Sequence, residues 1–396
     1  MGGSENARNA ASRETARDAE SEEDAGAPLR AFSTVSIVGV GLIGGSLALA
    51  LRRAGFRGVL RGASRPETLA QARALGAIDE GFPYERLGDA VAGADLVVLA
   101  SPIRTITEHL AVLGRTALEP GAVITDVGST KREIVAVADK HLPPAVTFIG
   151  GHPLAGSELR GVAAADPFLF QNAYYVLTPS PATAPGAPDR LAGFLGAIGA
   201  RVVLLDPEEH DRVAAAISHL PQLLAVSLVR FLDDLGPLRE HALRLAAGGF
   251  RDMTRIASSP YSVWHDIVDT NRDLIGEAFG SFERRAGSLF GALGSGALKA
   301  AFDDAARTRG TIPRDTKGFL SRLWDVLVVV EDRPGIIAGI SAPLAERGIN
   351  VKDIEVLKVR EGEGGSIRLA FASEEAAREA VEVLRAHGFE ARDRAE

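Results

Sequence analysis

The sequence contains no cysteine among its 396 residues. This absence excludes disulfide bonds, thiol catalysis and cysteine-ligated metal sites, and it is compatible with the reducing cytoplasm in which we expect the protein. The formal net charge is −8, and the chain has no block of basic residues. We therefore expect no nucleic-acid partner. We also expect no metal site.

The N-terminal region has few large apolar residues. Only Met1 and Leu29 are of this kind in the first thirty residues, which hold seven acidic and four basic side chains. Residues 1–30 are predicted to be a disordered tail, because they lack the apolar segment of a secretory signal and are too acidic for a transit peptide. The uncharged segment from Ala31 to Leu51 is about as long as a membrane span, but four glycines argue against such a helix. We expect no membrane partner.

The chain is long enough for two or three domains, and its 46% apolar and 24% charged residues are typical of a soluble protein. Within residues 31–206, short apolar runs bounded by Gly, Pro or Asp alternate with helical stretches. This alternation predicts an α/β domain with a mostly parallel, doubly wound sheet. The runs that follow the first are Val59–Gly62, Leu96–Ala100, Ala122–Thr125, Thr147–Gly150, Tyr174–Leu177 and Val202–Leu205.

The pattern changes twice beyond this α/β domain. Residues 207–310 have helical periodicity with few strand signals, which predicts a separate all-α domain. Residues 311–323 are predicted to be a linker, because the stretch TRGTIPRDTK (308–317) is polar and contains Gly and Pro. Residues 324–396 follow the order βαββαβ, which is typical of a small ferredoxin-like unit.

A glycine-rich turn joins the first strand to the first long helix, where VSIVGVGLIGGSLA (35–48) places Gly39, Gly41 and Gly44. The first glycine permits the tight turn, the second lets the backbone approach a pyrophosphate, and the third lets the helix pack on the strand. The turn therefore predicts a Rossmann dinucleotide site, with the helix N-terminus facing the anion. The candidate cofactor-binding residues in the turn and at nearby strand ends are Gly39, Gly41, Leu42, Ile43, Gly44, Ser101, Pro102 and Asp126.

Two polar motifs lie at the carboxyl ends of predicted parallel strands, where such sheets bind ligands. They are TDVGSTK (125–131) and GGHPLAGSE (150–158). His152, flanked by glycine and proline at a strand end, is predicted to be catalytic rather than structural. Ser129 can donate or accept a hydrogen bond beside it, although a serine near a helix start is often a plain N-cap.

Two arginines of the predicted helical domain are candidates for substrate binding. Arg251 and Arg255 are four residues apart and share one face if this stretch is helical. One of them is a candidate clamp for a substrate carboxylate, which the guanidinium fork matches bidentately. The alternative is a surface ion pair with one of the nearby carboxylates, namely Asp252, Asp266 or Asp269.

Four ordered motifs make the stretch from Val35 to Arg272 resemble the prephenate and arogenate dehydrogenases of tyrosine biosynthesis. They are GVGLIGGSLA, TDVGSTK, GGHPLAGSE and SHLP with TRIA. The C-terminal unit, with EDRPGIIAGI, resembles the amino-acid-binding ACT module that some members carry. We keep two alternatives open: another two-domain reductase of the β-hydroxyacid dehydrogenase or pyrroline-carboxylate reductase type, and a non-enzymatic nucleotide-sensing regulator.

The resemblance implies a reaction and a set of site residues. The reaction is oxidative decarboxylation, in which hydride leaves for NAD(P)+ and carbon dioxide is lost as the ring aromatises. His152 would take the proton of the ring hydroxyl, Ser129 would orient that hydroxyl, and Arg255 would bind the ring carboxylate. The other residues expected to line the substrate pocket are Ser157, Glu158, His219, Gln222 and Arg251.

The sequence departs from the family pattern at two positions. Gln222 follows SHLP where many prephenate-using relatives have histidine, so the choice between prephenate and arogenate stays open. Ser64, followed by Arg65, replaces the aspartate that usually binds the ribose 2′-hydroxyl of NAD. This pair can accept a 2′-phosphate instead, so we favour NADP and retain NAD use.

The resemblance also implies a homodimer and a regulatory ligand. The long apolar helices of the all-α domain exceed the needs of one small core, which favours a dimer interface there. In the C-terminal unit, a glycine between the first strand and helix would let a loop approach an amino acid. Tyrosine is the expected effector, and its candidate binding residues are Asp332, Pro334, Gly335 and Ile336.

Overall fold

The computed structural model describes residues 27–156, 159–312, 323–331, 333–360 and 364–393. Ser157, Glu158, Asp332, the first 26 residues and most of the predicted linker lie outside the described residues. The last residues of the predicted tail are not disordered, because η1 (Ala27–Ala31) is helical and buries Leu29. The chain forms two compact units, Met1–Leu298 and Lys299–Glu396.

An eight-stranded sheet forms the centre of the first domain, in the order β3-β2-β1-β4-β5-β6-β7-β8. Its central strands are apolar and buried, as helices on both faces require. Neighbouring strands are parallel except β6 and β7, which confirms the predicted doubly wound sheet. The strands are β1 (Thr34–Val38), β2 (Val59–Ala63), β3 (Glu80–Phe82), β4 (Leu96–Leu99), β5 (Val123–Asp126), β6 (Thr147–Pro153), β7 (Tyr174–Pro179) and β8 (Arg201–Leu204).

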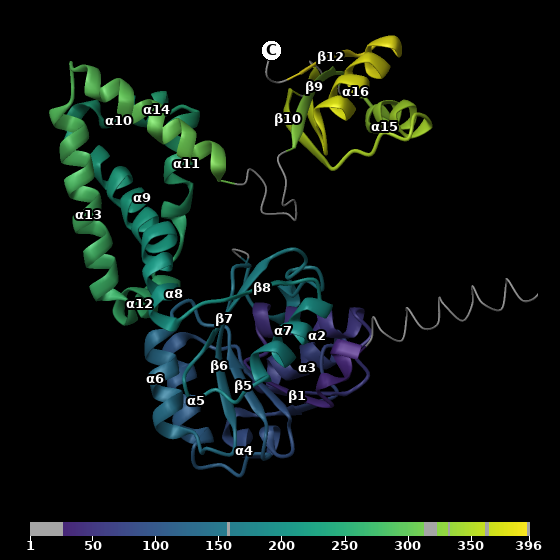
Figure 1. Cartoon of the computed structure of the whole chain (residues 1–396), viewed down its shortest axis with the longest axis vertical. Helices are drawn as coiled ribbons and strands as arrows, with labels where there is room; N and C mark the ends of the chain where they lie inside the picture. Colours follow the sequence, from purple (N-terminus) through teal and green to yellow (C-terminus); the bar gives the residue numbers. More distant parts are fainter. Residues whose placement is uncertain (1–26, 157–158, 313–322, 332, 361–363, 394–396) are drawn as a thin grey trace, which may run out of the picture. The chain divides into compact units, whose positions relative to one another are not determined.

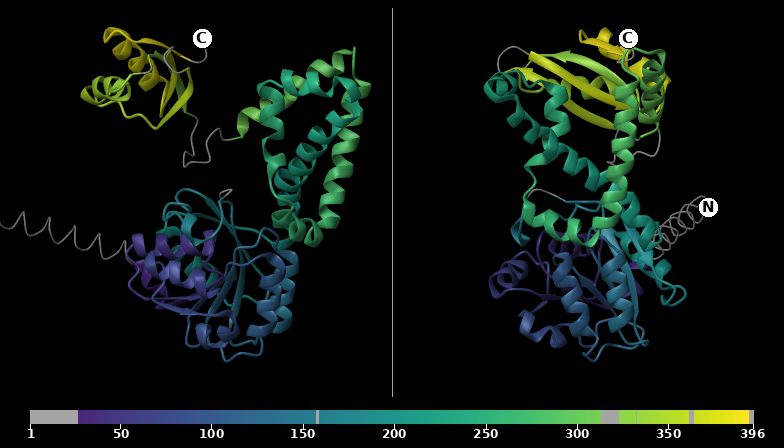
Figure 2. Two further views of the ribbon diagram at one scale, coloured as in Figure 1. Left: turned by 180° about the vertical axis from the view of Figure 1, so that it is seen from behind. Right: turned by 90° about the vertical axis from the view of Figure 1, so that its left-hand side faces the viewer.

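Helices cover both faces of this sheet (Figures 1 and 2). One face packs on α2 (Leu42–Arg53), α3 (Pro66–Ala74) and α7 (Ala187–Ala197). The other face packs on α4 (Leu87–Val91), α5 (Ile103–Leu113) and α6 (Arg132–His141). Each face has its own cluster of buried apolar side chains, so this domain has a complete core of its own.

The second domain of this unit is helical, as predicted, and begins at Asp206, whose carboxylate accepts a hydrogen bond from the Glu208 amide at 2.8 Å. In Figure 1, α9 and α13 extend away from the sheet domain, and α8 and α12 lie next to it. The helices up to α13 are α8 (Pro207–Ala214), α9 (Leu220–Phe231), α10 (Arg239–Leu245), α11 (Gly248–Thr254), α12 (Tyr261–Thr270) and α13 (Arg272–Gly291), with a π-helical turn (Ala215–His219) between α8 and α9 and a 3-10 turn η6 (Arg255–Ser258) after α11.

The C-terminal domain confirms the predicted βαββαβ order. Its strands form an antiparallel sheet in the order β10-β11-β9-β12. The elements are β9 (Trp324–Val330), α15 (Ile336–Glu346), β10 (Asp353–Arg360), β11 (Gly364–Phe371), α16 (Glu374–Ala386) and β12 (Glu390–Asp393). Before this domain in the sequence, α14 (Gly296–Thr311) ends at the first residue of the predicted linker, and the boundaries of that linker stay a prediction.

Candidate active site

The glycine turn between β1 and α2 has the geometry that a bound dinucleotide requires. Gly39 has φ +101°, and a Cβ there would lie 2.5 Å from the Ala100 carbonyl oxygen. A Cβ at Gly44 would lie 2.2 Å from the Gly39 carbonyl oxygen, so this glycine lets the helix approach the turn. Gly41 instead faces open space and precedes α2 with no side-chain cap. The amides of Leu42 and Ile43 thus begin a helix that can receive a phosphate.

Two other strand ends lie around this turn. Ser101, after β4, donates a long hydrogen bond of 3.4 Å to the Val38 carbonyl oxygen, and Pro102 is the N-cap residue of α5. Ser64 and Arg65 follow β2, where a Rossmann domain binds the ribose of its cofactor. Arg65 is exposed, whereas Ser64 is largely buried and its amide donates to the Phe82 carbonyl oxygen.

Asp126 has a structural role that its position alone did not indicate. Its side chain is fully buried, forms an ion pair with Lys131, and accepts hydrogen bonds from the Gly128 and Gly151 amides at 2.7 and 3.0 Å. Both carboxylate oxygens are therefore engaged inside the protein, and binding of the cofactor by Asp126 stays a prediction. Lys131 also donates to the Gly151 carbonyl oxygen at 2.6 Å, so the pair fixes the backbone next to His152.

His152 lies inside β6, which extends three residues beyond the predicted strand. Its side chain is partly buried, and Nδ1 lies 2.8 Å from Nε2 of His210. Burial lowers the pKa of His152 well below its usual value, and the nearby His210, Lys131 and His219 lower it further. The ring is therefore neutral at physiological pH, which is the form that accepts a proton.

His210 and Asp211 connect His152 to the helical domain. Both are buried residues of α8, and Nδ1 of His210 lies 2.8 Å from Oδ1 of Asp211. The Asp211 carboxylate also accepts the backbone amides of Lys131 and Arg132 at 2.7 and 3.0 Å. Asp211 thus takes the place of a cap at the N-terminus of α6, where a negative charge is favourable.

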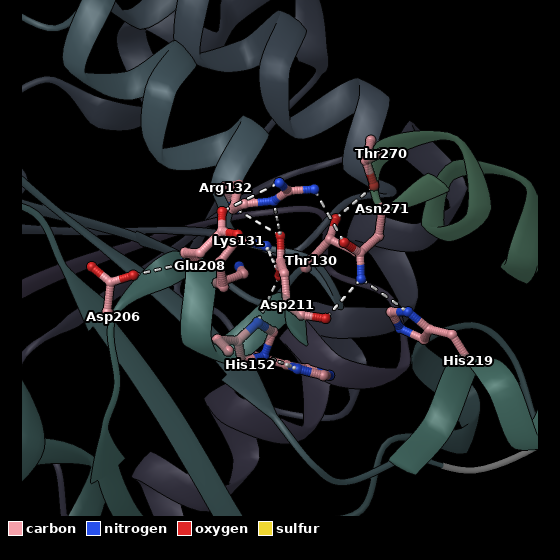
Figure 3. A network of polar contacts seen from close by, with 12 residues as sticks. Thr130, Lys131, Arg132, His152, Asp206, Glu208, Asp211, His219, Thr270 and Asn271 are labelled. Carbon is pink, nitrogen blue, oxygen red and sulfur yellow. Dashed lines mark hydrogen bonds and ion pairs between the residues drawn. The ribbon is translucent and has the colours of Figure 1, made fainter. Parts of the chain in front are cut away.

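A second histidine of the helical domain is held in the same network. The buried Asn271 donates to the Asp211 carbonyl oxygen at 2.8 Å and lies 3.2 Å from Nδ1 of His219 (Figure 3). An amide donor at Nδ1 makes that nitrogen the acceptor, so Nε2 of His219 carries the proton. Burial lowers the pKa of His219 to about 4. His219 is therefore a neutral hydrogen-bond donor at physiological pH.

Comparison with known proteins connects this geometry to a family. Residues 47–204 match the family described as prephenate dehydrogenase, nucleotide-binding domain, residues 206–300 match its dimerization domain, and residues 324–389 match the ACT domain. The prephenate dehydrogenase of Bacillus subtilis is 37% identical over 358 residues, which cover 89% of this chain and 96% of the relative. The chain belongs to the prephenate dehydrogenase family.

Solved members of the prephenate dehydrogenase family share the fold. The prephenate dehydrogenase of Aquifex aeolicus, solved with hydroxyphenyl propionate and NAD+, aligns with a TM-score of 0.66 at 33% identity, over 71% of this chain and 98% of that one. The arogenate dehydrogenase of Synechocystis aligns with a TM-score of 0.63 at 31% identity, over 70% and 98% of the two chains. Similar relatives are thus named for either substrate.

The remaining residues that the family resemblance assigned have different surroundings. Ser129 is partly buried in the loop before α6, but Lys131 occupies the N-cap position, so Ser129 is not a cap. Arg251 is in α11 and Arg255 begins η6, both exposed. The carboxylates once considered as their partners, Asp266 and Asp269, pair with Arg104 instead, which leaves the carboxylate-binding role open to either arginine. Gln222 is buried and donates to the Ile256 carbonyl oxygen at 3.0 Å, so it holds the turn that carries Arg255.

Sequence reasoning missed four residues that organise this prephenate dehydrogenase site. His210 and Asp211 form a His-Asp pair just after the last strand of the sheet, a signal that was visible in the sequence. Lys131 ends the TDVGSTK motif, but only the fold shows that its side chain turns inward to Asp126. Asn271 carried no signal, because its three partners come from segments distant in the sequence.

Proposed function

We propose that this chain is an NAD(P)-dependent dehydrogenase that converts prephenate to 4-hydroxyphenylpyruvate, or arogenate to tyrosine, by oxidative decarboxylation in tyrosine biosynthesis. The observation that carries this proposal is the neutral His152, which lies at the carboxyl edge of the sheet and is held by His210. Membership of the prephenate dehydrogenase family supports the choice of substrate class.

The residues of the site suit the steps of this reaction. His152 removes the proton of the ring hydroxyl as the carbon that bears it is oxidised, a contribution of roughly 10²- to 10⁴-fold. The bound nicotinamide would supply the hydride acceptor. The electron pair left by departing carbon dioxide makes the ring aromatic, and His152 returns its proton to the phenolate oxygen. Arg255 holds the ring carboxylate until it leaves, and Ser129 and the neutral His219 donate hydrogen bonds to the substrate.

The choice between the two substrates is tested by one steady-state experiment. Prephenate and arogenate differ only in a pyruvyl or alanyl side chain, and the buried Gln222 supports η6 beside the expected pocket. The assay measures kcat/KM for both substrates with both cofactors. Reduced cofactor together with carbon dioxide from at least one substrate is the expected result. Cofactor reduction by neither substrate would disprove the proposed function.

We also propose a preference for NADP over NAD. The support is local: an exposed Arg65 beside Ser64 stands where an aspartate would repel a 2′-phosphate. The NAD+ complex of the Aquifex aeolicus relative favours retaining NAD as the second cofactor.

A homodimer is the expected assembly. A groove of about 770 Å³ beside α13 is lined by apolar residues, among them Leu220, Leu274 and Phe282, and by charged residues, namely Arg212, Glu277, Arg284 and Arg285. The stretch Pro207–Leu245 is long and apolar enough to cross a membrane by length and composition. It also buries His210, Asp211 and His219, so we assign its exposed apolar residues to contact with a second copy of the dimerization domain.

Tyrosine is the proposed effector of the ACT domain. Gly335 has φ +86° and faces open space just before α15, which leaves room for a ligand near the helix N-terminus. Gly335→Asp should weaken tyrosine inhibition several-fold or more. The coupling free energy between an effector site and an active site is typically about 1 to 3 kcal/mol. Gly348→Asp, at another open glycine with positive φ, is the control. Equal inhibition of the wild type and Gly335→Asp would place the effector elsewhere.

A further inference from the structure

A chain of hydrogen bonds crosses from the nucleotide-binding domain to the helical domain behind His152. It runs from Nδ1 of His152 to Nε2 of His210 and from Nδ1 of His210 to Asp211, each step 2.8 Å long. Figure 3 labels its two ends, His152 and Asp211. His210 is 3% exposed and Asp211 is fully buried, so water does not compete for either contact.

The Asp211 carboxylate fixes the direction of both hydrogen bonds in the series from His152 through His210 to Asp211. It accepts two backbone amides, from Lys131 and Arg132, and its Oδ2 lies 3.6 Å from Nε of Arg132. A carboxylate has no proton to donate and accepts in each of these contacts. His210 must therefore donate from Nδ1, and its Nε2 becomes an acceptor.

The same logic then sets the tautomer of His152. Because Nε2 of His210 accepts, Nδ1 of His152 carries the proton and Nε2 keeps its lone pair. Within the described part of the chain, Nε2 of His152 has no hydrogen-bond partner. The nitrogen that must act as base is thus the one left available.

The charged groups around this chain come from several elements. Lys131 and Arg132 face it from α6, Asp126 from β5 through Lys131, and Glu208 from α8 through Arg132. The negative group bonded to the histidines is the carboxylate of Asp211, which Nε of Arg132 also approaches at 3.6 Å. A positive charge that arises on His152 can therefore be balanced through His210.

We propose that His210 and Asp211 are positioning residues that hold His152 with Nε2 free to take the substrate proton and that share the charge of the resulting imidazolium. When Nε2 binds the hydroxyl proton, the Nδ1 proton moves toward Nε2 of His210 while His210 Nδ1 stays bonded to Asp211. The shift reverses when His152 returns its proton to the phenolate, so no proton is lost. This inference rests on the proposed function, in which His152 is the base.

Two substitutions at His210 in the full-length enzyme test this inference. His210→Ala removes both hydrogen bonds, whereas the amide of His210→Gln can accept from His152 and donate to Asp211 but cannot bind the proton. We expect kcat to fall about ten- to hundredfold in His210→Ala, within the range of general-base contributions, and to recover partly in His210→Gln. The KM for substrate should stay within about twofold in both, because neither variant touches the substrate.

Control variants separate the possible outcomes. His141→Gln changes a histidine at the far end of α6 and should leave kcat unchanged. A normal kcat in His210→Ala, a loss seen only in KM, or no advantage of His210→Gln over His210→Ala would each overturn the inference. If His210→Ala does not fold, the comparison is between His210→Gln and His141→Gln. A lower kcat in His210→Gln with an unchanged KM supports the inference, and an equal kcat in the two variants overturns it. His152→Asn separates the proposed function from the positioning role of His210. Normal turnover in His152→Asn would disprove the role of His152 as the base, whatever the His210 variants show.

Discussion

The nucleotide-binding domain and the helical domain bury apolar side chains to very different extents. The first has a large cluster on each face of its sheet. In the described part of the helical domain, the one cluster holds three buried residues, Ala215, Leu274 and Ile275. Ile267 of α12 belongs instead to a cluster of the sheet domain. The helical domain is thus ordered at the site by contact with its neighbour.

The two domains also contribute different parts of the site. The self-sufficient domain carries the cofactor turn and His152, whereas the helical domain supplies His210, Asp211 and His219 as buried polar groups. A base in one domain that depends on partners in another requires both to be docked. Four predictions, ordered from the largest expected effect to the smallest, test this division of roles.

The largest effect is expected at the base of the self-sufficient domain. His152→Asn keeps a hydrogen-bonding side chain but cannot take the proton, so kcat should fall by about 10²-fold or more with little change in substrate binding. Stopped-flow turnover and a substrate titration measure the two quantities, and His141→Asn serves as the control. Near-normal turnover would remove His152 from the mechanism.

Breaking the subunit contact should affect the helical domain alone. Phe282→Asp replaces an apolar side chain of the groove beside α13 by a carboxylate, so we expect monomers and a loss of activity of more than about tenfold, because burying a charge at a subunit contact is costly. Cofactor binding to the nucleotide-binding domain should persist. Light scattering and cofactor fluorescence are the measurements, with the exposed Glu283→Gln as control. A dimeric, active Phe282→Asp would contradict the assigned interface.

A tenfold effect is expected for the substrate clamp. A charge-assisted bidentate contact contributes roughly 1.5 to 3 kcal/mol, so Arg255→Ala should raise the substrate KM about tenfold or more. The cofactor KM should not change, because the cofactor turn belongs to the other domain. Arg251→Ala, tested in parallel, decides which arginine binds the carboxylate. An unchanged KM in folded Arg255→Ala would give this arginine a structural role.

The smallest effect is expected for the cofactor preference. Ser64→Asp places a carboxylate near the 2′-phosphate of NADP, and like charges repel by about 1 kcal/mol or somewhat more, which lowers the affinity for NADP a few-fold to tenfold. NADP should weaken relative to NAD while substrate constants stay the same. Separate KM values for the two cofactors measure this. A wild-type enzyme that already prefers NAD strongly would refute the NADP proposal.

Local sequence patterns were sufficient to predict the buried strands and the glycine turn, because these elements depend on residues that are close together in the sequence. The apolar runs predicted the buried strands, because a strand covered on both faces must be apolar along its length. The positions of Gly39 and Gly44 predicted contacts that only a missing side chain permits. The three-residue strand β3 was missed, since a run so short has no periodicity to detect.

The sequence by itself therefore determined the order of the domains, the cofactor turn and the place of His152 at a strand end. Only the tertiary structure decided which groups surround that histidine. Lys131 turns inward to Asp126, and Asp211 reaches across from α8 to the N-terminus of α6, because buried charges and free amides need partners wherever the fold provides them. The partners Lys131 and Asp211 are 80 residues apart in the sequence. No local pattern records that separation, so the tautomer of His152 follows from the docking of two domains.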